Sequence, residues 1–220
     1  MNDKIANRHQ LYLDGIPVPQ SLIDKLLLEL RAWTKETGLV NKGRERPSIH
    51  ASNYMILRAK KEETSTTSTN SKNNKPSRRA LCKAKKLEKY KALWDLAKET
   101  LQGVDPGFAE RCTEIAVTYG FQGSPHIDKQ NCGPFYGLAL GEFVGGEISV
   151  ECSARVVAVV NTKHRLGRVD GRYPHWVNPY EVESSERYSL IYYETGSAFV
   201  KPGPAIFDLP RNESSSFAAS

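Results

Sequence analysis

The stretch EIAVTYGF at residues 114–121 decides the fold class, because apolar and polar side chains alternate along it. Alternation with a period of two is typical of a β-strand, whose successive side chains point to opposite sides of a sheet. Further extended stretches follow, separated by Gly, Pro or Asn turns: PFYGLALG (134–141), GGEISVE (145–151), RVVAVV (155–160) and RYSLIYYET (187–195). Many short strands of this kind predict a double-sheet barrel or jelly roll.

Helical patterns precede these strands. Residues 9–19 predict a short strand and a turn, after which a helix should follow with Ser21 as its N-cap and stop just before Gly38. A second, Lys-rich amphipathic helix is expected at residues 78–101, where apolar residues recur every three or four positions. We therefore expect an α+β protein, with a jelly-roll core buttressed by N-terminal helices.

The chain is expected to form one domain overall, in three parts. Residues 1–59 provide a strand and a helix that pack on the core, and residues 78–220 provide the Lys-rich support helix and the jelly roll. Residues 60–77 between them are polar and low in complexity. Such a segment cannot bury apolar surface, so a flexible loop is predicted there.

Composition limits the cellular setting and the partners. No apolar run is long enough for a membrane span, and the N-terminal MNDKIANRHQ lacks the apolar run of a signal peptide. The four cysteines include no CxxC pair, which argues against a disulfide scaffold or a zinc knuckle. We expect an intracellular protein, nuclear or cytoplasmic, with no membrane contact and no obligate protein partner evident. Its net charge of +6 favours a polyanionic partner such as DNA.

An HxD motif directly follows the first predicted strand of the core. His126 and Asp128 are two positions apart, so in an extended segment both side chains point to the same side. They would supply an imidazole and a carboxylate to one metal ion. Short motifs of this kind also occur by chance, and the alternative is a surface histidine beside a solvated aspartate.

A second imidazole has two candidates. His175 lies in RYPHWV, where Pro174 and Trp176 would hold it in a rigid, partly apolar setting, whereas His164 lies in a Lys- and Arg-rich probable turn. We favour His175. Two histidines and one carboxylate form the facial triad that suits Fe(II), because three protein ligands leave three octahedral positions open.

Those open positions suit a 2-oxo acid and O₂ as cosubstrates. A 2-oxo acid can take two of them, which leaves one for O₂. The distal carboxylate of 2-oxoglutarate then needs a charged donor, and Arg187 and Ser189 lie two apart on a predicted strand, so both can face that carboxylate. The alternative for Arg187 is a surface ion pair with Glu186 or Glu194.

Several further residues are candidates for the pocket. Asn131 and Tyr136 follow the HxD motif and, like Tyr119, could line the pocket, although core packing is an alternative for the aromatic residues. Three arginines near His175 could gather at the pocket mouth and contact phosphates, or belong to a solvated loop: Arg165, Arg168 and Arg172.

Taken together, residues 106–196 resemble the 2-oxoglutarate- and Fe(II)-dependent dioxygenase superfamily. The stretches FQGSPHIDKQNCGPFYGLALGEFVGGEISVE (121–151) and LGRVDGRYPHWVNPYEVESSERYSLIYYET (166–195) look like its TET/JBP-like branch in protists, algae and fungi. The resemblance implies a double-stranded β-helix. It also implies iron ligation by His126, Asp128 and His175, with the cosubstrate carboxylate held by Arg187 and Ser189.

The function that the resemblance implies is hydroxylation of a C–H bond. The expected target is the methyl group of 5-methylcytosine or thymine in DNA, and a base in a duplex would have to be flipped out to reach the iron. Two alternatives stay open. The same chemistry could act on a protein side chain or a small molecule, or the chain could be a non-catalytic β-helix module that binds nucleic acid.

Overall fold

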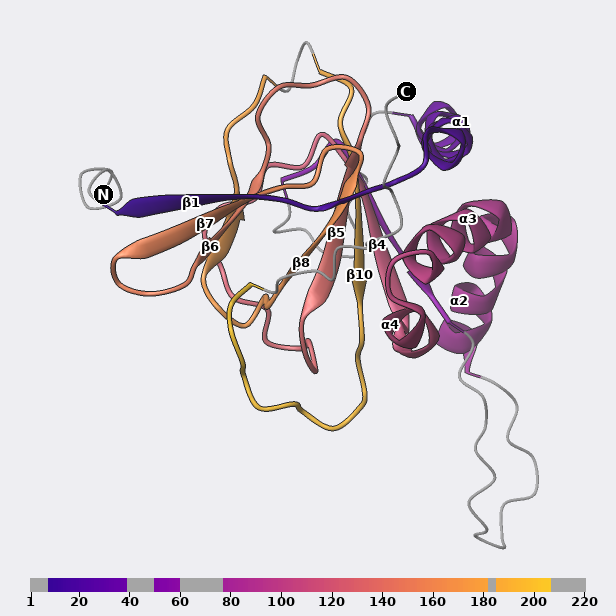
Figure 1. Cartoon of the computed structure of the whole chain (residues 1–220). Helices are drawn as coiled ribbons and strands as arrows, with labels where there is room; N and C mark the ends of the chain where they lie inside the picture. The colour runs from indigo at the N-terminus through magenta and orange to yellow at the C-terminus, as the bar shows by residue number, and fades with distance from the viewer. Residues whose placement is uncertain (1–7, 39–49, 60–76, 182–184, 207–220) are drawn as a thin grey trace, which may run out of the picture.

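A computed structural model describes residues 8–38, 50–59, 77–181 and 185–206 (Figure 1). Fourteen helices and strands lie in these ranges. Of the predicted loop at residues 60–77, only Ser77 falls among them, where its side chain caps a helix. No helix in the described ranges is long and apolar enough to cross a membrane.

The strands form two sheets. The larger has six strands in the order β2 (Ile16–Pro17), β8 (Arg165–Val169), β5 (Phe135–Leu140), β10 (Tyr188–Tyr193), β4 (Glu114–Tyr119) and β3 (Asn53–Arg58). The smaller has four in the order β1 (His9–Asp14), β7 (Val156–Asn161), β6 (Ile148–Glu151) and β9 (His175–Val177). Every pairing in both sheets is antiparallel except that of β1 with β7.

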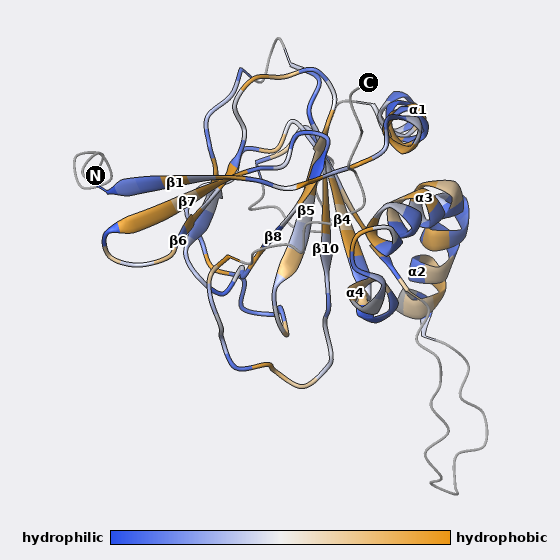
Figure 2. Cartoon of the chain, viewed as in Figure 1, coloured by the Kyte–Doolittle hydropathy of each residue, from blue (hydrophilic) through white to orange (hydrophobic). Residues whose placement is uncertain are grey.

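A hydrophobic core lies between the two sheets. Ala116 and Phe135 of the larger sheet share one buried cluster with Ile148 and Val150 of the smaller sheet. The sheets approach closely there, because a side-chain carbon at Gly137 would lie 2.7 Å from Ile148 Cδ1. Figure 2 shows the apolar character of β7, which lies within the smaller sheet.

Helices cover the other face of the larger sheet (Figure 1). They are α1 (Gln20–Thr37), α2 (Arg78–Lys89), α3 (Lys91–Gln102) and α4 (Pro106–Arg111). A second core cluster joins their apolar sides to that face, with Leu30 and Leu101 from helices and Leu138 and Leu190 from strands. The mixture of helices with a sheet-rich core confirms the predicted α+β class.

The helix predicted at residues 78–101 is interrupted, which differs from the prediction. Tyr90 separates α2 from α3 and has φ −109° and ψ 33°. The two halves pack on different partners, since α2 contacts β3 whereas α3 contacts α1 and α4. The regular spacing of apolar residues continues across Tyr90, so the sequence pattern alone does not reveal the break between the two helices. The first helix begins at Gln20, so Ser21, the predicted N-cap, lies inside it. It ends at Thr37, directly before Gly38, as predicted.

The core on the helical side gives a prediction for stability. Leu190 is 0% exposed and lies between Val117 and Leu138 on the neighbouring strands. We expect Leu190→Ala to lower the free energy of unfolding in urea by about 2–5 kcal/mol, because it leaves a cavity. Leu28→Ala is the control, since Leu28 is 68% exposed, and its effect should stay within about 0.5 kcal/mol. Equal losses in both variants would contradict this core.

Candidate metal centre

Backbone hydrogen bonds bring the HxD motif against β9. His126 N–H donates to His175 O at 3.0 Å, and His175 N–H donates to His126 O at 2.9 Å. Asp128 N–H donates to Gly171 O at 2.7 Å. The chain therefore holds the HxD segment and the segment before β9 side by side, although the two histidines are far apart in sequence.

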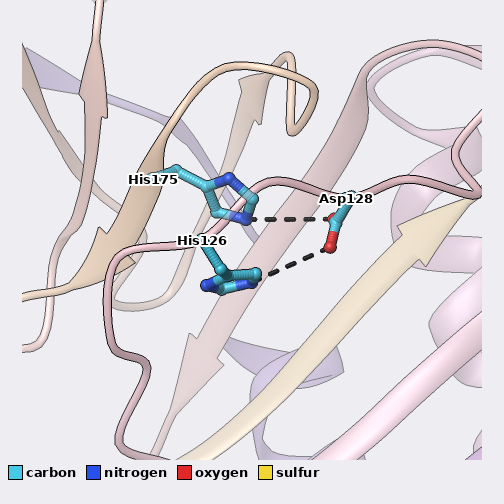
Figure 3. A group of neighbouring side chains, drawn as sticks. All are labelled: His126, Asp128 and His175. Carbon is cyan, nitrogen blue, oxygen red and sulfur yellow. Dashed lines mark ion pairs between the residues drawn. The ribbon is translucent and has the colours of Figure 1, made fainter.

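The side chains of His126, Asp128 and His175 converge on one point (Figure 3). One ligand atom from each lies within 4.8 Å of the other two. His126 Nε2 is 3.7 Å from Asp128 Oδ1, and His175 Nε2 is 3.8 Å from Asp128 Oδ2. Two imidazoles and one carboxylate at these distances can hold a metal ion, and such a donor set suits Fe(II).

Each imidazole is oriented through its second nitrogen. His126 Nδ1 lies 2.7 Å from Ser124 O, and His175 Nδ1 lies 3.0 Å from Tyr173 O. A backbone carbonyl at Nδ1 selects the tautomer with the proton there, which leaves the Nε2 lone pair for a metal. Burial also lowers the pKa of His175, partly offset by the Asp128 carboxylate. His175 is therefore held in the neutral form that a metal requires.

The three residues line a pocket of about 550 Å³. Its walls include Thr118 of β4 and the aromatic rings of Tyr54, Phe121 and Trp176. Ile127, between the two ligands of the HxD motif, is 48% exposed and also lines the pocket. The metal candidate therefore adjoins a space that a small organic group can enter.

Asn131 lies beside the triad. It lines the pocket, is only 5% exposed, and donates from Nδ2 to Asp128 Oδ2 at 2.9 Å. Gly171 is a neighbour that the sequence did not suggest. A side-chain carbon there would lie 2.8 Å from Asp128 Oδ2. The sequence around a single glycine in a turn does not reveal that its missing side chain makes room for a carboxylate elsewhere in the chain.

Tyr119 and Tyr136 lie away from this pocket. Tyr136 belongs to the helix-side core, and its hydroxyl donates to Asp105 Oδ2 at 2.9 Å. Burial and that hydrogen bond raise the pKa of Tyr136. Tyr119 packs against the same core, its ring centre 4.8 Å from that of Tyr188. The reason is strand alternation: Phe135 lines the pocket, so the next residue faces the helices.

Arg187 is buried between aromatic rings. It is 2% exposed, and its guanidinium carbon lies 5.2 Å from the ring centre of Phe143 and 4.9 Å from that of Tyr180. Nη1 donates to Ser189 Oγ at 2.8 Å and Nη2 to Gly146 O at 2.7 Å, while Nε has no hydrogen-bond partner among the described residues. Burial lowers the pKa of Arg187.

The acidic residues considered as surface partners of Arg187 bind other arginines. Glu186 accepts two hydrogen bonds from Arg31, at 2.7 and 2.6 Å, and Glu194 lies 3.7 Å from Arg111. Arg187 is not among the residues that line the pocket. Its partner Ser189 pairs across the sheet with Thr118, which does line the pocket.

Thr118 connects the pocket to the strand that follows Arg187. Its hydroxyl is buried and finds no hydrogen-bond partner in the described part of the chain, and the residue is 4% exposed. Paired residues of neighbouring strands project to the same side of a sheet. Arg187, Ser189 and Thr118 therefore face the space between the sheets together.

The remaining basic candidates lie elsewhere. His164 occupies the turn between β7 and β8 with φ +56° and does not belong to the metal cluster. Arg165 lies 3.9 Å from Asp14 of β1. Arg168 lies 3.8 Å from Asp105, and Arg172 binds Asp170 through two hydrogen bonds of 2.8 and 2.6 Å. None of these three arginines lines the pocket.

Comparison with known proteins gives structural likenesses only. No protein-family model and no curated protein sequence matches the chain. A prolyl-4-hydroxylase from Pseudomonas putida is similar with a TM-score of 0.45 at 16% identity, over 82% of this chain and 90% of that one. NgTET1 in complex with 5mC DNA is similar with a TM-score of 0.38 at 13% identity, over 84% and 72%.

A third similar structure is an oxidoreductase of the 2OG-Fe(II) oxygenase family from Burkholderia pseudomallei. Its TM-score is 0.32 at 16% identity, and the match covers 40% of this chain and 45% of that one, less than half of its length. What the chain can do is therefore inferred from the geometry of His126, Asp128 and His175.

Proposed function

We propose that this chain is an Fe(II)- and 2-oxoglutarate-dependent dioxygenase that hydroxylates a C–H bond, and that its two sheets form a double-stranded β-helix. The observation that carries the proposal is the convergence of two imidazole nitrogens and a carboxylate within 4.8 Å at the wall of a pocket. Three protein ligands leave open the positions that a 2-oxo acid and O₂ need. Bound Fe(II), with 2-oxoglutarate and O₂, would supply the oxidant.

Two buried donors between the sheets, on Arg187 and Thr118, would hold the distal carboxylate of 2-oxoglutarate. Arg187 has five N–H donors, and two of its nitrogens donate to Ser189 and Gly146, while Nε has no partner in the ranges that the structure describes. Thr118 Oγ1 is also without a partner on the same side of the sheet. Buried polar atoms are seldom left unpaired, so these two donors favour an acceptor that arrives with the cosubstrate.

The substrate that we propose is the methyl group of a modified nucleobase in DNA, 5-methylcytosine or thymine. Phe121 and Trp176 line the pocket of about 550 Å³ together with the candidate metal ligands, and aromatic rings are residues on which a flipped base can stack. The net charge of +6 would favour approach to DNA. A protein side chain is the second candidate, because Ile127 exposes apolar surface beside the ligands.

The triad is tested by variants with a matched histidine control. We expect His126→Ala, Asp128→Ala and His175→Ala to abolish Fe(II)-dependent succinate formation from 2-oxoglutarate, because each removes a ligand. His164→Ala should retain it, since His164 lies outside the cluster. Succinate formation that persists in the three ligand variants would refute the proposed chemistry.

The cosubstrate anchor is tested by changing the donor and keeping the charge. Arg187→Lys should raise the Kd of 2-oxoglutarate by about 10-fold or more, because a lysine cannot present the planar fork. Metal affinity, measured by titration, should change little. Arg31→Lys is the control, since Arg31 also makes a two-point contact but at the surface. Equal 2-oxoglutarate affinity in both variants would argue against the anchor.

The substrate is identified by mass spectrometry. Duplex and single-stranded oligonucleotides containing 5-methylcytosine or thymine are incubated with Fe(II), 2-oxoglutarate and O₂, and we expect a base heavier by one oxygen atom. A peptide library is the parallel arm. Oxidation confined to peptides would support the second candidate, and succinate released without any oxidised base would argue against DNA.

A further inference from the structure

We propose that Asn131 is a positioning residue that keeps Asp128 a one-oxygen ligand of the metal. The inference rests on the proposed function. Asp128 Oδ1 lies 3.7 Å from His126 Nε2, and Asp128 Oδ2 lies 3.8 Å from His175 Nε2. Of the two oxygens, only Oδ2 accepts a hydrogen bond within the described residues, from Asn131 Nδ2 at 2.9 Å. The amide therefore engages Oδ2, whereas Oδ1 accepts no hydrogen bond from the described residues and stays available to the metal.

The hydrogen bond is built into the fold. Asn131 is 5% exposed, and within the described residues its side chain makes no other hydrogen bond. The residue after it is anchored, since Cys132 N–H donates to Glu194 O at 3.2 Å and Cys132 O accepts from Val200 N–H at 2.9 Å. A buried amide held this way keeps its direction when the metal site is empty or filled.

Gly171 also restricts the space around the Asp128 carboxylate. Asp128 N–H donates to Gly171 O, and a side-chain carbon at Gly171 would lie 2.8 Å from Asp128 Oδ2 and 2.8 Å from Phe135 Cε1. Only glycine leaves Oδ2 room at this position. Asn131 and Gly171 thus define a socket for Oδ2, one by a hydrogen bond and the other by the absence of a side chain.

The consequence for the reaction concerns the number of open metal positions. A carboxylate that binds through both oxygens would occupy two positions, so only two would remain for the cosubstrate and O₂. Holding Oδ2 in its socket preserves the three that a chelating 2-oxo acid and O₂ need together. Asn131 would therefore act on cosubstrate binding more than on metal binding.

The test uses Co(II), which replaces Fe(II) without turnover, and a matched pair of amides. Asn131→Ala and Asn131→Leu remove the donor, and the leucine also excludes water that could replace it. The control is Asn178→Ala, because Asn178 is a half-buried amide that binds Ser149 and Glu147 instead of Asp128. Visible absorption of the Co(II) protein, the Kd of Co(II) and the Kd of 2-oxoglutarate are measured for each.

We expect both Asn131 variants to alter the Co(II) spectrum and to raise the Kd of 2-oxoglutarate by about 10-fold or more, with a much smaller change in the Kd of Co(II). Gly171→Ala should change the spectrum in the same direction. Asn178→Ala should leave all three unchanged.

Two results would overturn the inference, and they are distinguishable. If the unaltered protein binds Co(II) and 2-oxoglutarate but the Asn131 variants differ only in melting temperature, Asn131 is merely structural and the proposed function stands. If the unaltered protein binds neither, the proposed function falls and the inference falls with it.

Discussion

The site depends on the reciprocal pair of backbone hydrogen bonds between His126 and His175, of 3.0 and 2.9 Å. Such a pair fixes the distance between two segments and which way their side chains project. Because Asp128 is tied in turn to Gly171, the loop after β4 and the segment that leads into β9 form one unit. The three candidate metal ligands are therefore placed by the backbone.

The fold class was predictable because strand alternation depends on the sequence locally. Strict alternation along β5 also predicts that Phe135 and Tyr136 face opposite sides of the sheet, because neighbours in a strand cannot both face one pocket. Contacts between residues far apart in the sequence were harder to predict. The preference for His175 over His164 rested on its rigid flanks, and the structure places it next to His126 through a pairing between β9 and the HxD loop. No local pattern contains that pairing.

The neighbours of the ligands were the least predictable part. Asn131 was expected near the pocket, but its hydrogen bond to Asp128 depends on how the loop turns after the motif. Gly171 matters through the volume that it leaves, which depends on the position of Asp128 across the site. The break at Tyr90 has the same origin, since the halves of the expected helix meet different surfaces. In each case the deciding contact is tertiary.

Arg187 shows how the site and the stability of the fold are linked. A guanidinium almost fully removed from water loses hydration, and the rings of Phe143 and Tyr180 with the carbonyl of Gly146 offset that loss only in part. The lowered pKa of Arg187 reflects this imbalance. An arriving carboxylate would supply the missing negative charge where water screens it least. Desolvation of Arg187 would therefore lower the stability of the protein without cosubstrate and strengthen the attraction between Arg187 and the proposed cosubstrate. Binding of the cosubstrate would in return stabilise the folded chain.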